Sequence, residues 1–99
     1  MATKQQLIDA TCDRLSIRRF SVSTGSTEPR AFLVAVIEQL GLQALTSGLD
    51  KPGLGRLIVE AGGRPWLPSY DSRGSTVTKR GLEAILETVQ RLVGQTRVQ

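Results

Sequence analysis

The stretch GSTVTKRGLEAILE, residues 74–87, repeats much of GSTEPRAFLVAVIE, residues 25–38, at a distance of 49 positions. Six of the 14 aligned pairs are identical, and three more exchange one basic or one aliphatic residue for another, although Leu and Ala are common in any helix. Each copy contains a polar Gly-Ser-Thr turn, then a basic residue, Arg30 or Lys79, and then an amphipathic helix. The chain is therefore predicted to contain two repeats, about 1–49 and 50–99.

Capping signals and apolar spacing predict two helices in the first half. Thr3, followed three residues later by Gln6, is a capping-box signature and begins a helix over about residues 4–15. Thr27 is a candidate N-cap for the second helix, with Glu28 and Pro29 in its first turn. That helix is expected to end in a Schellman motif at Gly41.

Two further helices are predicted in the second half. Asp50 caps the third helix, which the pair Gly62-Gly63 ends. The fourth helix is predicted over about residues 78–93, with Gly94 stopping it and residues 95–99 as a fraying tail. Gly81 lies in its first turn, where the cost of glycine suggests close approach by another segment.

These elements give a fold prediction. Residues 64–73 contain Pro65 and Pro68 and are not helical, so each half reads as helix, long extended connector, turn and helix. We expect a mainly α fold in which two similar helix-extended-loop-helix halves pack as a four-helix domain, a single domain over residues 1–99. The alternative is a winged helix with residues 64–78 as the wing.

Composition limits the chemistry. The net charge is +4 with a pI near 10.0, which is compatible with nucleic acid but is also common in proteins that bind none. With no His and a single Cys, a zinc site and ordinary acid–base catalysis are disfavoured, so neither an enzyme, a cofactor nor a metal is expected. No signal peptide or apolar span is recognised, which predicts a cytoplasmic protein.

Two carboxylate pairs are spaced four residues apart on the predicted helices. Asp9 and Asp13 form one pair, and Glu83 and Glu87 form the other. Such pairs can hold a metal, but they usually line a solvated face. Arg91, four residues after Glu87, is its expected ion-pair partner.

The repeated turn is the candidate binding site. A helix N-terminus has unpaired amide donors and partial positive charge, so hydroxyls and a cation beside it suit a phosphate. The alternative is that these Ser and Thr residues only cap helices. The predicted DNA-binding residues are the polar and basic residues of the two turns and connectors: Arg18, Arg19, Ser26, Thr27, Arg30, Arg73, Ser75, Thr76, Lys79 and Arg80.

The aromatic residues of the second connector leave two interpretations open. Trp66 either stacks on a base or wedges into a groove, or, as we favour, packs in the core between Pro65 and Pro68. Tyr70 stays undecided between core and contact.

The halves resemble a known pattern. KQQL at residues 4–7, an extended connector, then a Gly and a basic residue before Leu33 resemble the helix-extended-loop-helix motif of SAP-type DNA-binding modules, and residues 51–82 resemble it again. The connectors are longer than in that family, and the basic residue stands farther from the Gly. In that family the second helix and the preceding loop contact the DNA backbone. The resemblance carries this role onto Ser26, Thr27, Arg30, Ser75, Thr76 and Lys79.

Residues 51–86 are also similar to accessory domains attached to bacterial restriction endonucleases. The resulting hypothesis is a non-catalytic domain that binds double-stranded DNA through its phosphates and targets a larger protein. The rival hypothesis is a protein-interaction or oligomerisation module of a multidomain defence or regulatory protein. In that case the second and fourth helices present apolar surface to a partner.

Overall fold

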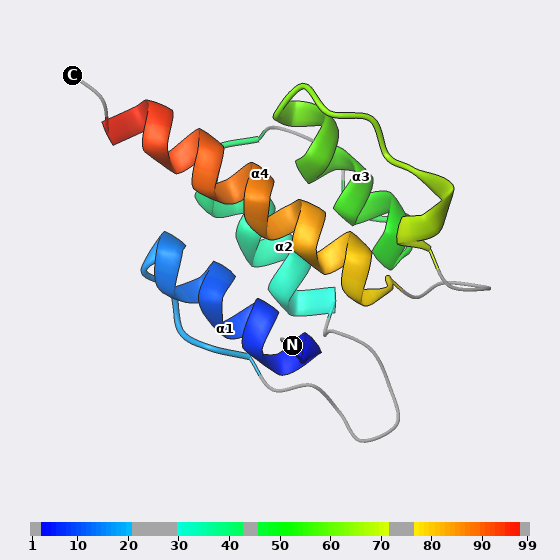
Figure 1. Ribbon diagram of the computed structural model, residues 1–99, viewed down its shortest axis with the longest axis horizontal. Coiled ribbons are helices and arrows are strands. Elements are labelled where there is room, and N and C mark those ends of the chain that lie inside the picture. The colour runs from blue at the N-terminus through cyan, green and yellow to red at the C-terminus, as the bar shows by residue number, and fades with distance from the viewer. Residues whose placement is uncertain (1–2, 21–29, 43–45, 72–76, 98–99) are drawn as a thin grey trace.

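Four helices make up most of the part of the chain that the computed structural model describes, residues 3–20, 30–42, 46–71 and 77–97, with side chains as far as Val93. In chain order they are α1 (Lys4–Leu15), α2 (Arg30–Gln39), α3 (Lys51–Ala61) and α4 (Lys79–Arg97), with a short 3-10 helix, η1 (Pro68–Tyr70), before α4 (Figure 1). The described residues contain no strand, only an isolated antiparallel bridge between Asp71 and Val77. The mainly α, four-helix prediction is confirmed, and these residues do not form a winged helix.

Local capping explains where the helices begin. The Thr3 hydroxyl accepts a hydrogen bond from the Gln6 amide at 3.1 Å, while the Gln6 side chain accepts one from the Thr3 amide at 2.9 Å. Asp50 caps α3 by accepting from the Gly53 amide at 2.9 Å. These two predicted starts are confirmed. The start predicted at Thr27 lies outside the described residues.

Three helices end in the same way. Ser16, Gly41 and Gly63 adopt positive φ angles of 59°, 74° and 83°, one or two residues after the ends of α1, α2 and α3. At the end of α2, the Gly41 amide donates to the Glu38 carbonyl and the Leu42 amide donates to the Ile37 carbonyl, both at 3.1 Å. This is the Schellman motif predicted from Gly41.

The predicted end of the fourth helix is wrong. α4 continues through Gly94 to Arg97, so residues 95–97 belong to the helix. A helical glycine costs about 1 kcal/mol relative to Ala, and less near an end, which does not by itself terminate a helix. No proline follows Gly94 to prevent continuation.

All four helices run in the same direction, so their starts lie at one end of the bundle and the ends of α1, α2 and α3 lie together toward the other (Figure 1). Connectors must therefore travel back along the bundle. By residue 20 the chain has returned to the first turn of α1, since the Phe20 carbonyl accepts from the Gln5 side chain at 2.7 Å. After α3, the Tyr70 carbonyl accepts from the Thr78 amide at 2.9 Å, next to the start of α4.

The core joins residues of all four helices. α4 packs against α1, α3 and η1, and α2 packs mainly against α3. The fully buried side chains are mostly aliphatic: Ile8, Phe32, Leu33, Val36, Ile37, Leu54, Ile58, Val59, Val77, Leu82 and Ile85. None of the described helices combines the length and apolar character needed to cross a membrane.

Glycine permits two close approaches in the second half. A Cβ at Gly81 would lie 2.8 Å from the Tyr70 carbonyl oxygen and 2.4 Å from a methyl group of Val77, which confirms the close approach predicted there. A Cβ at Gly55 would lie 2.8 Å from the Trp66 ring. The second connector is therefore packed tightly along α3 and onto the first turn of α4.

Candidate functional site

The start of α4 is the best described part of the predicted site. Thr78 is the N-cap: its hydroxyl accepts from the Gly81 amide at 3.2 Å. The same hydroxyl shares its proton between the carbonyls of Ser69, at 3.0 Å, and Tyr70, at 3.1 Å. The helix is thus tied to η1, and Lys79 and Arg80 follow at its first two positions. Sequence reasoning missed Thr78, although a Thr directly before a basic pair and an amphipathic helix is a capping signal.

Arg30 lies at the first described residue of α2 and has a structural role. Its guanidinium donates to the Thr46 carbonyl at 2.6 Å and also to the Leu49 carbonyl. These contacts fasten the start of α2 to the connector that leads into α3. Arg30 remains exposed, and further guanidinium N–H groups are available to an anion.

Two other predicted residues lie on the return connector after α1. Arg19 donates to both carboxylate oxygens of Asp13, at 2.7 and 3.1 Å, and lies 3.9 Å from an oxygen of Asp9. This hydrogen bonding lowers the pKa of Asp13 below its usual value. The Arg18 guanidinium lies 5.3 Å from the centroid of the Phe20 ring, a cation–π geometry. Arg18 is therefore the less neutralised of the pair.

Half of the predicted site cannot be placed. Ser26 and Thr27 of the first turn, and Arg73, Ser75 and Thr76 of the second, lie outside the described residues. The structure brings Arg30, Lys79 and Arg80 to the starts of helices at the same end of the bundle (Figure 1).

A pattern of charge unites the helix starts. α1, α3 and α4 each begin with a lysine, Lys4, Lys51 and Lys79, and their first turns contain no acidic residue. Two described acidic residues lie close to them: Asp50, the N-cap of α3, and Asp71, which is bridged to Val77 just before α4. Cations at helix N-termini oppose the helix dipole, at a cost of about 0.3–1 kcal/mol each. Because the helices are parallel, these charges and the positive dipole ends collect at one end.

The aromatic residues of the connector contribute to packing. Trp66 is half-buried against the core, and its indole N–H donates to Asp71 at 2.8 Å. Its ring stands edge-on to the buried Tyr70 ring, with centroids 5.0 Å apart. These contacts match the core interpretation of Trp66 that the sequence favoured. Leu67, 43% exposed, is the large apolar side chain that this connector leaves in solvent.

One ion pair differs from expectation. Glu87 accepts a hydrogen bond from Arg64, on the second connector, and not from Arg91 as its spacing had suggested. The Arg64 contact fixes the connector on α4, a non-local arrangement that spacing along one helix does not reveal.

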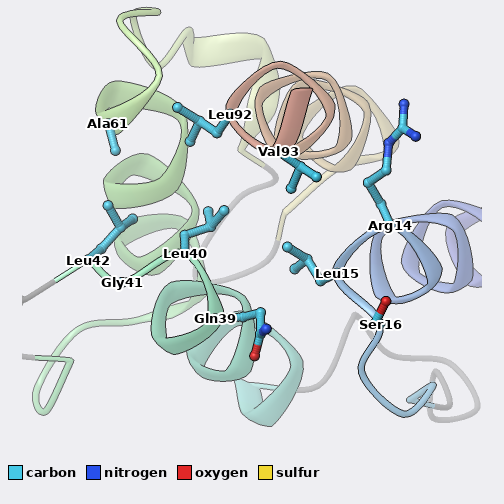
Figure 2. A pocket seen from close by; sticks show the side chains of 10 residues that line it. All are labelled: Arg14, Leu15, Ser16, Gln39, Leu40, Gly41, Leu42, Ala61, Leu92 and Val93. Carbon is cyan, nitrogen blue, oxygen red and sulfur yellow. The ribbon is translucent and has the colours of Figure 1, made fainter. Parts of the chain in front are cut away.

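The opposite end of the bundle contains a cavity of about 700 Å³ where α1, α2 and α3 end beside α4 (Figure 2). Its walls are mainly aliphatic, and its polar groups come from the ends of α1 and α2. No spacing within a single helix of the sequence predicts this cavity.

Groups with catalytic or metal-binding potential are sparse in the part of the chain that the structure describes. No cluster of three or more His, Cys, Asp or Glu residues is placed there to hold a metal. Cys12 is a free thiol inside the core, and burial raises its pKa. A thiol of that kind is protonated at neutral pH and behaves as a small apolar side chain.

Comparisons with known proteins add no family. No family model, curated protein or solved structure matches this chain.

Proposed function

We propose that this chain is a non-catalytic domain that binds double-stranded DNA through phosphate contacts, made by the end of the bundle at which its helices begin. It acts as the targeting part of a larger protein. The observation that carries the proposal is the collection of basic first residues, Lys4, Lys51 and Lys79, at the starts of parallel helices. Arg30 and Arg80 add two exposed cations to the same end.

Lysines at helix starts lower the stability of the free protein but favour the binding of phosphate. Helix starts normally favour Asp and Glu, so lysines there reduce stability by a few tenths to about 1 kcal/mol each. A bound phosphate reverses the sign, because it interacts favourably with both the dipole and the cation. Several such positions on one face match a polyanion better than a single small anion.

The arrangement of each half supports the same proposal. Each half contains two parallel helices, and the described part of the connector after the first of them runs back along the bundle (Figure 1). SAP-type modules, which the sequence resembles, have this helix-extended-loop-helix order. Phosphate contacts position a protein without reading bases, so we expect little sequence preference from this end alone.

The test is fluorescence anisotropy of a labelled duplex at two or more salt concentrations. We compare wild type with the double variant Lys79→Ala, Arg80→Ala. The control is Arg14→Ala, Arg91→Ala, which removes the same charge toward the opposite end of α1 and α4. Loss of two phosphate contacts lowers affinity roughly tenfold or more and reduces the slope of log K against log salt by about 2.

Two results would overturn the proposal: no binding by wild type at low salt, or equal loss in the test and control variants. Equal loss would indicate that only net charge matters. Arg30 is unsuitable as the main test residue, because its replacement also frees the carbonyls of Thr46 and Leu49.

One observation favours the rival hypothesis of a protein-interaction module. The inner faces of α2 and α4 are buried in the core, but α2 has a shallow outer groove of about 440 Å³. Its lining combines apolar and charged side chains: Phe20, Ala31, Val34 and Ala35 with Arg18, Arg30 and Glu38. Absence of DNA binding would make this groove the next surface to test, by changing Val34 to Glu and measuring partner capture.

A further inference from the structure

We infer that the cavity at the ends of α1, α2 and α3 is a binding site for an uncharged, mainly apolar small molecule. The cavity is partly open to solvent and measures about 700 Å³, a volume within the range of about 300–1,000 Å³ that small-molecule sites occupy. Figure 2 shows aliphatic side chains from all four helices or their immediate ends around it: Leu15, Leu40, Leu42, Ala61, Leu92 and Val93.

Unequal helix lengths explain why the cavity exists. α4 has 19 residues, whereas α1, α2 and α3 have 12, 10 and 11. At 1.5 Å per residue, α4 is about 28 Å long and the others about 15–18 Å. α4 therefore continues past the ends of its neighbours (Figure 1).

Among the described residues, the apolar face of α4 is less covered beyond the point where its neighbours end. Val89 is fully buried, but Leu92 and Val93 are only half-buried. Leu40 and Leu42, on the opposite wall, are half-buried too. Apolar surface left open in this way is stabilised by an apolar occupant, at roughly 25 cal/mol for each Å² covered.

The polar lining determines the chemical class of the ligand. Ser16 and Gln39 offer a hydroxyl and an amide at the rim, which suit one or two neutral polar groups. The lining residues that the structure describes include no acidic side chain to hold a cation. Among the described lining residues, Arg14 is the charged one, and its guanidinium points away from the leucines (Figure 2). Helix C-termini also carry partial negative charge, which disfavours an anion.

The direct test uses N-phenyl-1-naphthylamine, a neutral probe whose fluorescence increases in an apolar environment. We compare wild type with Ala61→Phe, which places a ring in the cavity, and with Ala10→Phe, which adds the same ring on the exposed face of α1. Wild type and Ala10→Phe are expected to bind one probe saturably. Ala61→Phe binds at least tenfold more weakly, a difference of about 1.4 kcal/mol.

A second measurement locates the probe without any substitution. Methyl NMR of wild type is expected to show shifts at Leu15, Leu40, Leu42, Leu92 and Val93, with the core methyls of Leu54 as the internal control. This readout does not depend on whether Ala61→Phe folds.

The charge of the preferred ligand is tested with dodecanol, laurate and dodecylamine as competitors of the probe, since they share a hydrocarbon chain and differ in head-group charge. Dodecanol is expected to displace it best. Better competition by laurate or dodecylamine would overturn the uncharged class.

The site itself is overturned if no saturable binding occurs, if Ala61→Phe binds as well as wild type, or if the shifts lie elsewhere. It is also overturned if sedimentation shows a dimer that excludes the probe, because a second copy then covers the cavity. None of these readouts involves DNA, so their outcome is independent of the proposed phosphate contacts.

Discussion

The two ends of this bundle differ in packing and in charge. At the end where the helices begin, α4 lies so close to the connector that Gly81 leaves no room for a Cβ against the Tyr70 carbonyl. At the end where α1, α2 and α3 finish, the half-buried Leu40, Leu42 and Leu92 line a cavity of about 700 Å³. The first end carries the lysines that open three helices, and the second has a mainly aliphatic lining.

Helix direction is the cause of this difference. In an antiparallel bundle, each end would mix helix starts and helix ends, and the dipoles would largely cancel. Here the helices are parallel (Figure 1), so start signals and positive dipole ends add at one end. Residues that begin or end single helices thereby determine the charge of a whole end of the bundle.

The largest expected effect tests the close packing at the first end. Gly81→Ala puts a Cβ 2.4 Å from a Val77 methyl group and 2.8 Å from the Tyr70 carbonyl oxygen. The methyl group can shift, but the backbone carbonyl accepts a hydrogen bond from the Thr78 amide, which holds it in place. We expect a loss of about 3 kcal/mol in the free energy of unfolding, measured by urea denaturation.

Gly53→Ala is the matched control in the first turn of α3. Its Cβ meets only side chains, the nearest being a carboxylate oxygen of Asp50 at 3.1 Å, and Ala is the better helix former. We expect a change within about 0.5 kcal/mol. Equal destabilisation by the two variants would mean that the first end is no more tightly packed than an ordinary helix start.

The next effect concerns backbone conformation at the other end. Ser16 and Gly41 occupy equivalent left-handed positions after α1 and α2. Because a side chain disfavours this conformation, Ser16→Gly is expected to stabilise the protein by about 0.5–1 kcal/mol, and Gly41→Ser to destabilise it by a similar amount.

Thermal unfolding measures both changes. A Cβ at Gly41 meets no atom within 4 Å, so steric contact does not complicate the second variant. Two shifts of the same sign would show that the helix ends are held by something other than their left-handed residues. Ser47, in the connector before α3, provides a control: its φ angle is not positive, so Ser47→Gly should not stabilise the protein.

Sequence signals correctly predicted the helix starts and ends that depend on contacts between near neighbours in the chain. Thr3 and Asp50 begin helices, and Gly41 ends one, because each cap bonds within a few positions of itself. The same reasoning put Arg30 and Lys79 beside helix starts. It failed at Gly94, where a weak local preference for ending the helix is insufficient against continued helical hydrogen bonding.

Contacts between distant residues were not predictable in this way. Arg30 donates to carbonyls 16 and 19 residues away, and Glu87 pairs with Arg64, 23 residues away, instead of a neighbour on its own helix. The cavity likewise depends on the relative lengths and direction of all four helices. No spacing within one helix encodes those quantities.

The smallest expected effect concerns Arg19 and tests whether it belongs to the end of the bundle at which the helices begin. Its hydrogen bonds hold the pKa of Asp13 below the usual value of 3.8, so the ion pair contributes stability above that pH and loses it as the pH falls through the lowered pKa. In Arg19→Gln, the pKa of Asp13 should rise toward its usual value, as followed by carboxyl NMR. Arg56→Gln, which removes the partner of Glu60, should leave Asp13 unchanged.

DNA binding by the same variant shows whether the DNA-binding surface is limited to the helix starts or includes the first connector. Arg19 is already paired with Asp13 and Asp9, so Arg19→Gln should weaken binding far less than Lys79→Ala. A loss equal to that of Lys79→Ala would extend the DNA-binding surface along the first connector, beyond the helix starts. An unchanged Asp13 titration would instead show that the ion pair, exposed on both sides, does not persist in solution.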